Sequence, residues 1–353
     1  MYIIQGTGER LRDFNYRTGK ENRWHIYKLD NIQLSADLEY IYSEQANLFG
    51  RDWYEQQMKK VERVNDCSDF LIFGRWQDEN GNKHGKLIKA NFCKHRLCAT
   101  CNWRKSLVMY AQTNKIVEEM EKRQPTARYI FLTLTMKNMT SDKLSESIDK
   151  LLKASSAIYS QNAKGAKSLA GFRKYLLGGQ RILEITYNYE ADTYHPHLHL
   201  VLAVKPVYFA AGYITQERWC AYWQELLGVD YTPMVGVTTI KPKADKSQAK
   251  KGEKSMAGAV AEVSKYPIKS FEILHIEDDN KRRKAIKVLL EASYNRRFVS
   301  FFGEFANIRK DLRMSDIEKA NLIETGNEDE PTGDSAMSYY LYKFNVKAGC
   351  YIC

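Results

Sequence analysis

The chain has 353 residues, of which 44% are hydrophobic, and its 54 Lys and Arg outnumber its 43 Asp and Glu to give a net charge of +11. No apolar run approaches the roughly 20 residues that span a membrane, and the N-terminus lacks the basic-then-apolar pattern of a signal peptide. We therefore expect a cytoplasmic protein without a membrane partner. The positive charge favours a polyanionic partner, most commonly nucleic acid, and a basic protein without such a partner is the alternative.

The first predicted region is basic and aromatic at its start and helical afterwards. Residues 1–34 allow no firm assignment, whereas Ser35 is placed to cap a helix and 51–64 has the pattern of a second helix. The length of the chain suits one large domain with additions, or two domains. We divide it into an N-terminal region, a cysteine segment, a core, a C-terminal helical extension and an acidic linker with a tail: 1–64, 65–122, 123–280, 281–323 and 324–353.

The cysteine segment has the spacing of a structural zinc site. Cys98 and Cys101 form a Cys-x-x-Cys pair, Cys93 lies close before it, and a hairpin of strands Phe70–Trp76 and Lys86–Asn91 would return Cys67 as the fourth ligand. Thiols stay reduced in the cytosol, which favours ligation of Zn²⁺ over disulfides. His95 in place of Cys67, or four unrelated buried cysteines, are the alternatives. A helix from Trp103 to Lys122 is predicted to follow.

The core region alternates strands and helices in the order of a split βαβ, or ferredoxin-like, fold. This order predicts an α+β fold with an antiparallel sheet, helices on one face, and the first strand beside the strand that begins at His195. The predicted elements are a strand at Arg128–Thr135, a helix capped by Ser141, a helical stretch at 165–177 broken by Gly178 and Gly179, a strand at Arg181–Tyr187, the strand that begins at His195, a helix at Thr215–Leu227, a strand at Met234–Ile240 and a helix at Met256–Tyr266.

Three of the seven histidines, His195, His197 and His199, fall within five residues and alternate, so on a strand they share one face. Glu184 lies on the strand that would pair with theirs in a hairpin. Two imidazoles and a carboxylate suit a catalytic divalent ion such as Mn²⁺ or Mg²⁺ with open positions for substrate oxygens, which assigns His197, His199 and Glu184 as ligands. His195 precedes a proline at the start of the strand and is expected to face substrate or support the ligands. A purely structural histidine strand is the alternative.

A second candidate centre lies on the helix that ends this region. Glu262 and Tyr266 are four residues apart, so on one helix a carboxylate would lie one turn from a phenol that could act as a nucleophile. Such pairs are also common on solvated helices. Nearby lysines are candidates for contacts with DNA phosphates, three in a basic loop and two around Tyr266: Lys250, Lys251, Lys254, Lys265 and Lys269.

Three motifs together give a specific resemblance: Phe131-Leu-Thr-Leu-Thr135, then His195-Pro-His-Leu-His199, then Glu262-x-x-x-Tyr266. In this order they resemble the motifs of bacterial rolling-circle plasmid replication initiators, which are HUH endonucleases with one catalytic tyrosine. The cysteine segment resembles one found upstream of the motifs in the same family.

The resemblance implies a function and an HUH-type fold. Tyr266 would nick one strand of the plasmid origin, forming a 5′-phosphotyrosine and a free 3′-hydroxyl for a host polymerase, with a host helicase as a further partner. Glu262 would activate the water that terminates replication. A homodimer is a candidate assembly. A non-catalytic zinc-dependent DNA-binding regulator, which would leave the histidine strand unexplained, and an HUH transposase are the alternative functions.

Overall fold

A computed structural model describes residues 4–14, 19–163, 166–241, 254–265, 268, 270–326 and 336–353. The chain forms two compact units, each described by itself below. The first unit comprises residues 1–111, 270–287 and 316–353, and the second comprises 112–269 and 288–315. The two predicted terminal regions, 1–64 and 324–353, therefore contribute to the same unit.

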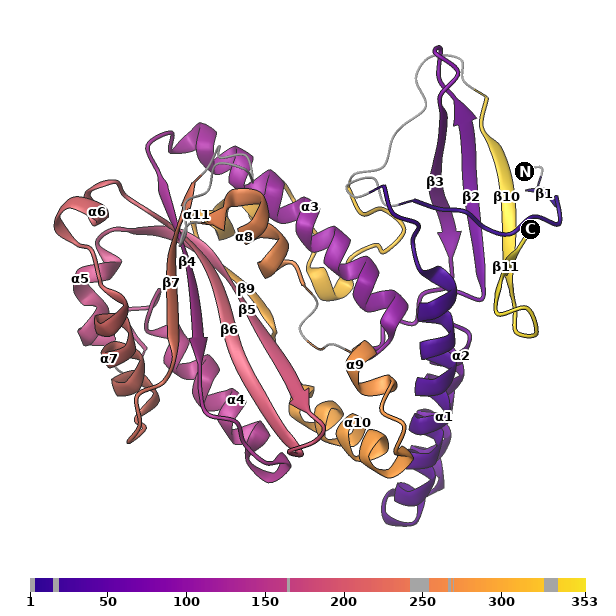
Figure 1. Cartoon of the computed structure of the whole chain (residues 1–353), viewed down its shortest axis with the longest axis horizontal. Helices are drawn as coiled ribbons and strands as arrows, with labels where there is room; N and C mark the ends of the chain where they lie inside the picture. The colour runs from indigo at the N-terminus through magenta and orange to yellow at the C-terminus, as the bar shows by residue number, and fades with distance from the viewer. Residues whose placement is uncertain are drawn as a thin grey trace. The chain divides into compact units, whose positions relative to one another are not determined.

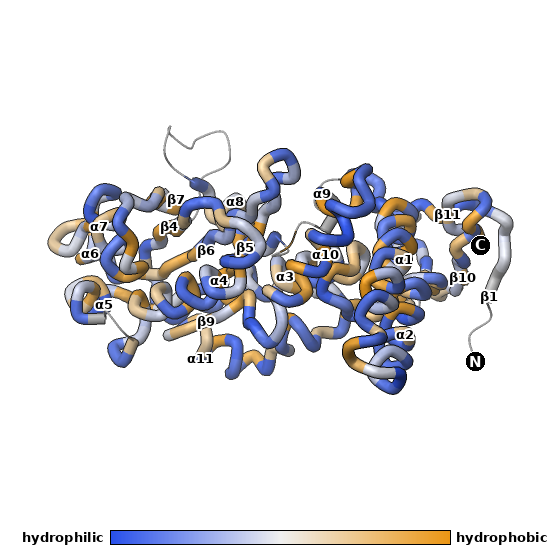
Figure 2. Tube along the Cα trace, turned by 90° about the horizontal axis from the view of Figure 1, so that it is seen from below, coloured by the Kyte–Doolittle hydropathy of each residue, from blue (hydrophilic) through white to orange (hydrophobic). Residues whose placement is uncertain are grey.

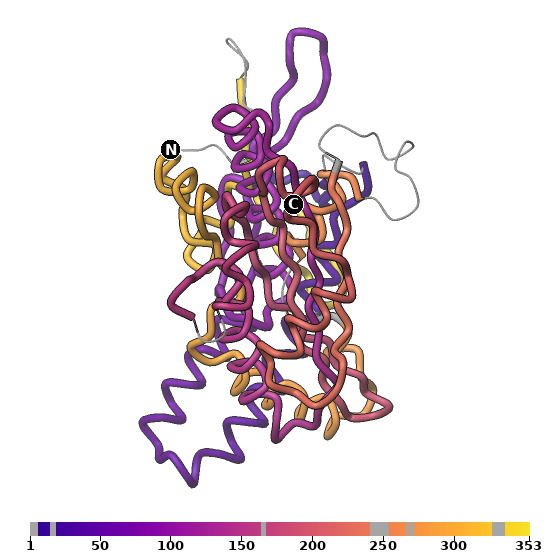
Figure 3. Tube along the Cα trace, turned by 90° about the vertical axis from the view of Figure 1, so that its left-hand side faces the viewer, coloured from indigo at the N-terminus to yellow at the C-terminus, as the bar shows by residue number. Residues whose placement is uncertain are grey.

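The first unit contains a sheet whose central path runs β1-β10-β2-β3, with β11 paired to β10. The predicted hairpin is confirmed as β2 (Phe70–Gln77) and β3 (Lys83–Ala90), and Figure 3 shows it as an extended purple loop. The other strands come from the two ends of the chain: β1 (Ile4–Gln5), β10 (Ser338–Asn345) and β11 (Cys350–Ile352). The helices of this unit are α1 (Trp24–Phe49), α2 (Arg51–Asn65), α9 (Ser270–Leu274), the first part of α3 (Ala99–Arg123) and most of α10 (Asp279–Ser293).

The expected helix start at Ser35 is wrong, because α1 already begins at Trp24. Ser35 lies inside the helix, where its hydroxyl donates to the carbonyl of Ile32 at 2.7 Å. The buried face of α1 carries polar side chains such as Asn31 and Asp37, which are both fully buried. The apolar period of Leu34, Leu38 and Ile41 therefore does not extend to the first turns of the helix, where most buried positions are polar, and this hides the helix start in the sequence.

The second unit contains a six-stranded sheet in the order β8-β7-β4-β6-β5-β9 (Figure 1). Neighbouring strands are antiparallel except for the short β7–β8 pair, and β4 lies beside the histidine strand β6 as expected. Hydrophobic stretches of β4 and β6 appear orange in Figure 2. The strands are β4 (Arg128–Thr135), β5 (Leu176–Asn188), β6 (Thr193–Val204), β7 (Val235–Lys241), β8 (Lys254–Ser255) and β9 (Val299–Gly303). The helices are the second part of α3, α4 (Ser141–Ser156), α5 (Ala170–Arg173), α6 (Val207–Ala211), α7 (Gln216–Leu227), α8 (Met256–Val263), the end of α10, and α11 (Glu304–Asp311), with a 3₁₀ turn at Ala166–Leu169.

Helices cover both faces of this sheet, so the expectation of helices on one face is wrong. Successive residues of β5 point to opposite faces. Arg181 donates to the hydroxyl of Ser155 on α4, whereas Gln180 accepts from Thr113 on α3 and donates to the carbonyl of Val263 on α8. The face that carries Gln180 also carries the histidines, because Gln180 pairs with Val201 in β6 and Glu184 with His197. Helices α3 and α8 therefore lie on the histidine face.

Gly178 and Gly179 were expected to break a helix, but they lie within β5, which starts at Leu176. A Cβ atom on Gly178 would lie 2.7 Å from the backbone nitrogen of Glu304, and one on Gly179 would lie 2.5 Å from the carbonyl oxygen of Val201. Glycine is required here because neighbouring backbone approaches closely, not because a helix ends. Helical structure in the predicted stretch 165–177 is confined to the short turn and α5.

Two helix ends illustrate the limits of sequence signals. Helix α7 begins after Thr215, whose hydroxyl accepts from the Arg218 backbone, and it ends before Gly228, which has the left-handed conformation; these bounds agree with the predicted helix at Thr215–Leu227. Helix α8 was expected to reach Tyr266 but ends at Val263. Proline has no N–H group, so Pro267 cannot donate the helical hydrogen bond to the carbonyl four residues before it, that of Val263. Within the described ranges, no helix is long and apolar enough to cross a membrane.

Candidate metal and catalytic site

The structure brings Glu184, His197 and His199 together on one face of the six-stranded sheet. Strand pairing places Glu184 directly opposite His197, and His199 follows two residues along β6. The Nε2 atoms of His197 and His199 lie 3.4 and 3.2 Å from the same oxygen, Oε2 of Glu184. Two donor atoms bound at about 2.1 Å to one ion are separated by about 3.0–3.4 Å in octahedral or tetrahedral geometry. The donor set and its spacing therefore fit one divalent ion.

Each imidazole is fixed through its other nitrogen. The Nδ1 atom of His199 lies 3.1 Å from the hydroxyl of Thr133 on β4, and Nδ1 of His197 lies 3.2 Å from the backbone carbonyl of His195. An Nδ1–H that donates to oxygen leaves Nε2 as the free lone pair. Both Nε2 lone pairs would then be available to an ion beside Glu184, as metal ligation requires, whereas doubly protonated rings would donate their Nε2–H groups to that carboxylate.

His195 lies on the same face but outside this group of three donors. Its Nδ1 lies 2.7 Å from the side-chain oxygen of Asn138. Burial and the neighbouring His197 lower the pKa of His195, which favours the neutral ring. The expected role of His195, to face substrate or to support the ligands, stays a prediction.

Glu184 is ionised in this environment. Burial raises the pKa of its carboxyl group, but hydrogen bonds and charge interactions with His197 and His199 outweigh burial and hold the pKa well below its usual range. The side chain is only 7% exposed. A buried carboxylate of this kind requires cationic neighbours, which protonated imidazoles or a bound metal ion supply.

Glu262, near the end of α8, reaches the same site. Its Oε1 lies 3.9 Å from Nε2 of His199 and accepts a hydrogen bond from Lys265 at 2.8 Å. Lys254 lies 3.8 Å from the other carboxylate oxygen and stacks its ammonium over the ring of Phe131 at 3.6 Å. Burial raises the pKa of Glu262, but Lys265 and Lys254 outweigh this effect and lower it. The site thus combines a carboxylate with two cations beside the three metal-ligand candidates.

Four predicted site residues lie outside the described residues: Tyr266, Lys250, Lys251 and Lys269. Glu262 approaches His199, and Ile268 forms a β-bridge with Ile185, the neighbour of Glu184.

Four of the six cysteines of the first unit converge in a separate cluster: Cys67, Cys93, Cys98 and Cys101. Sγ–Sγ separations are 3.6 Å for Cys67–Cys101, 3.8 Å for Cys93–Cys101 and 3.5 Å for Cys67–Cys98. Thiolates bound tetrahedrally to zinc at about 2.3 Å are about 3.8 Å apart, so the cluster fits Zn²⁺. His95 lies outside this group, and its Nδ1 instead accepts from the backbone N–H of Leu97 at 3.3 Å.

Backbone N–H groups point at the sulfur atoms. Lys94 donates to Cys101 at 3.2 Å, His95 donates to Cys93 at 3.4 Å, and Lys94 has a φ of 59° that shapes the turn. The pKa of Cys93 is held below its usual range, first by its hydrogen bond with Cys101. Backbone N–H groups that donate to sulfur stabilise thiolates, and the thiolate is the form that binds metal. Cys350 and Cys353 lie outside the cluster.

Comparison with known proteins gives the family. The profile of the Rep_1 replication protein family matches residues 84–352. A Protein rep of Streptococcus pneumoniae serotype 2 is 34% identical over 91% of this chain and 88% of its own length, and a Protein rep of Bacillus amyloliquefaciens is 34% identical over 97% of both chains. A replication protein of Staphylococcus aureus is 31% identical over 67% of this chain and 95% of its own length. No solved structure matches the chain significantly.

The chain therefore belongs to the Rep_1 replication protein family, in agreement with the resemblance to plasmid replication initiators that its motifs carry. Sequence reasoning overlooked two polar partners of the histidines, Thr133 and Asn138. The position of Thr133 opposite His199 could have been derived from the predicted adjacency of β4 and β6, because both residues face the same side. Asn138 follows β4 in a loop and carried no such signal.

Proposed function

We propose that this protein initiates rolling-circle replication of a plasmid as an HUH-type nicking endonuclease. The observation that carries the proposal is the convergence of Glu184 with the Nε2 atoms of His197 and His199, each ring being fixed through Nδ1. The strand order β7-β4-β6-β5, with every neighbouring pair antiparallel, is the order of the ferredoxin-like sheet that such enzymes use.

In the proposed site, Glu184, His197 and His199 hold Mn²⁺ or Mg²⁺. The ion supplies charge stabilisation at the non-bridging oxygens of the scissile phosphate. Lys254 and Lys265 add positive charge beside Glu262 and are placed to contact neighbouring phosphates. A structural Zn²⁺ bound by Cys67, Cys93, Cys98 and Cys101 completes the metal content.

Tyr266 is the proposed nucleophile. Its phenolic oxygen attacks phosphorus as its proton leaves to a base, the bond from phosphorus to the 3′ oxygen breaks, and that oxygen takes up a proton. The products are a 5′-phosphotyrosine and a free 3′-hydroxyl that a host polymerase can extend. Glu262, ionised and 3.9 Å from His199, is the proposed base for the water that makes the terminating cut. A second strand transfer rejoins the released strand.

The test uses a supercoiled plasmid that carries the replicon encoding this chain, incubated with Mn²⁺. The wild-type protein should nick the plasmid and form a protein–DNA adduct that resists denaturation. Tyr266→Phe and the His197→Ala/His199→Ala double variant should do neither, whereas Tyr189→Phe, at an exposed tyrosine of the β5–β6 turn, should behave as the wild type. Adduct formation by Tyr266→Phe would refute the assignment of the nucleophile.

A further inference from the structure

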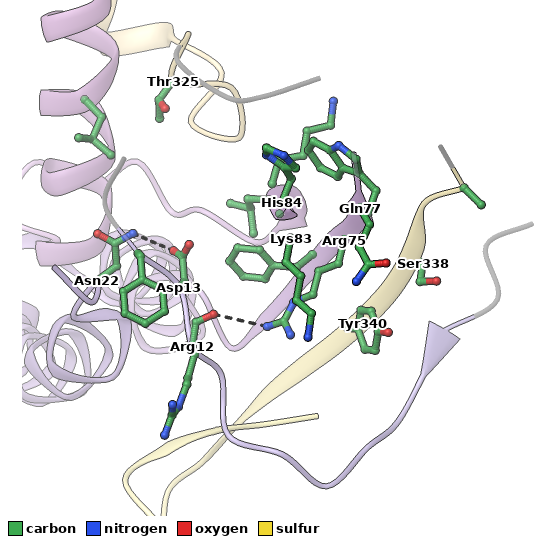
Figure 4. A pocket seen from close by; sticks show the side chains of 18 of the residues that line it. Arg12, Asp13, Asn22, Arg75, Gln77, Lys83, His84, Thr325, Ser338 and Tyr340 are labelled. Atoms are coloured by element: carbon green, nitrogen blue, oxygen red, sulfur yellow. Dashed lines mark hydrogen bonds between the residues drawn. The ribbon is translucent and has the colours of Figure 1, made fainter. Parts of the chain in front are cut away.

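The first unit contains a pocket of about 960 Å³ that the nicking chemistry does not use. It lies along the β2–β3 hairpin, between the N-terminal segment and strand β10. Figure 4 shows Arg75, Lys83 and His84 across its centre, with Asp13 on one side and Tyr340 on the other. All of these residues belong to the first unit.

The lining of this pocket is strongly basic. Five cationic side chains line it against one carboxylate, that of Asp13. The carboxylate already accepts hydrogen bonds from Asn22 at 2.9 Å and from the indole of Trp24 at 2.7 Å, so it holds the chain segment that forms one wall. The five cationic residues are Arg12, Arg75, Lys83, Lys86 and Arg104.

Three of these cations form no ion pair with any carboxylate of the described residues. The guanidinium of Arg75 donates to the backbone carbonyl of Arg12 and lies over the rings of Tyr340 and Tyr342, with its centre 5.4 and 5.5 Å from the two ring centroids. Within the described part of the chain, no carboxylate forms an ion pair with Arg12, Arg75 or Lys83. Concentrated positive charge in a hollow focuses the field and attracts an anionic ligand.

The pocket also presents aromatic faces. The ring of His84 stacks on that of Trp76, with 5.4 Å between centroids and 15° between planes, and the side chain of Phe14 is 56% exposed. Flat rings next to cationic groups are the combination that binds unpaired bases and their phosphates. A hollow that is lined in this way admits splayed bases, whereas the stacked bases of a duplex cannot enter it.

We propose that this pocket is a second DNA site, which binds a short segment of single-stranded DNA independently of the nick site. Phosphates would pair with Arg12, Arg75 and Lys83, and a base would stack against His84 or Phe14. The choice of DNA as the polyanion rests on the proposed function. Binding itself requires neither Tyr266 nor the catalytic ion.

The test measures binding of the full-length chain, with no divalent ion added, to fluorescent oligothymidylate of 15 nucleotides and to a duplex of equal length. The variant is Arg12→Ala/Lys83→Ala, which removes two exposed lining cations, and the matched control is Lys59→Ala/Lys89→Ala, which removes two exposed lysines of the same unit outside the pocket. Each phosphate contact contributes about 0.7 to the salt slope of single-strand binding. Two lost contacts therefore lower the slope by about 1.4 and weaken binding roughly 25-fold at 0.1 M salt.

We expect single-strand binding to weaken roughly 25-fold in the pocket variant and its affinity to change less than twofold in the control. We also expect photo-crosslinks from an oligonucleotide containing 5-iododeoxyuridine to peptides that carry Phe14, His84 or Tyr340. The proposal would be overturned if both variants lost affinity for oligothymidylate equally, or if the pocket variant kept the wild-type affinity. It would also be overturned if only duplex binding were lost, or if crosslinks were confined to the second unit. Oligothymidylate contains no nick site, so this binding does not depend on adduct formation by Tyr266. The binding results would therefore stand even if Tyr266 formed no adduct, and the nicking proposal and the pocket proposal can be refuted independently.

Discussion

Thr133→Val tests whether the hydrogen bond to His199 prepares that ring for metal binding. The hydroxyl of Thr133 lies 3.1 Å from Nδ1 of His199, and valine has nearly the same shape but cannot accept the bond. The imidazole then loses the partner that directs its Nε2 lone pair toward Glu184. Mutation of such supporting partners typically costs about 10- to 100-fold in metal affinity or activity, which corresponds to about 1.4–2.8 kcal/mol.

The assay is a titration with Mn²⁺ in which free ion is followed by electron paramagnetic resonance, so that binding is measured without catalysis. Thr135→Val is the matched control, since Thr135 lies on the same strand and face but donates to the carbonyl of Met234 at 2.9 Å. The control should lose about 1 kcal/mol of stability and keep the wild-type affinity for Mn²⁺. Unchanged affinity in Thr133→Val, or an equal loss in Thr135→Val, would refute the reasoning.

Three further predictions concern other parts of the molecule. Cys98→Ser should reduce bound zinc from one ion per chain to nearly none and increase amide exchange in the first unit, whereas Cys220→Ser should change neither; zinc retained by Cys98→Ser would contradict the four-thiolate site. Arg282→Met should lower the free energy of unfolding by about 3–5 kcal/mol in urea titration, because it removes the main partner of the buried carboxylate of Asp37, and a loss below 1 kcal/mol would show that this pair is dispensable. Glu262→Ala should keep initial nicking of the supercoiled plasmid but accumulate products longer than one unit, and loss of the first nick would instead give Glu262 a role in initiation.

The candidate metal site could be predicted from sequence because its geometry is local. Alternation in β6 fixes which histidines share a face, and the short turn between Asn188 and Thr193 fixes the register that places Glu184 opposite His197. The cysteine cluster was predictable for the same reason, since a hairpin of ordinary length returns Cys67 to the Cys-x-x-Cys turn.

Features that depend on distant segments could not be predicted. Asp37 and Arg282 are 245 residues apart, and nothing near either residue indicates that they meet. The sheet of the first unit takes strand β10 from the C-terminal end of the chain, and β9 extends the second sheet at the edge of β5. The glycines of β5 show the same limit, because a close approach by remote backbone leaves the same sequence signal as a helix stop.

Covalent transfer of the 5′ end of the nicked strand to Tyr266 is the step on which the proposed function depends most. Its most direct test is to trap the adduct with Mn²⁺, digest protein and DNA, and identify the modified peptide by mass spectrometry. We expect a nucleotide joined through its 5′ phosphate to Tyr266, formed only when a divalent ion is present and absent in His197→Ala/His199→Ala. A nucleotide on another residue, a 3′-phosphate linkage, or an adduct that forms equally well in the double-histidine variant would contradict this expectation.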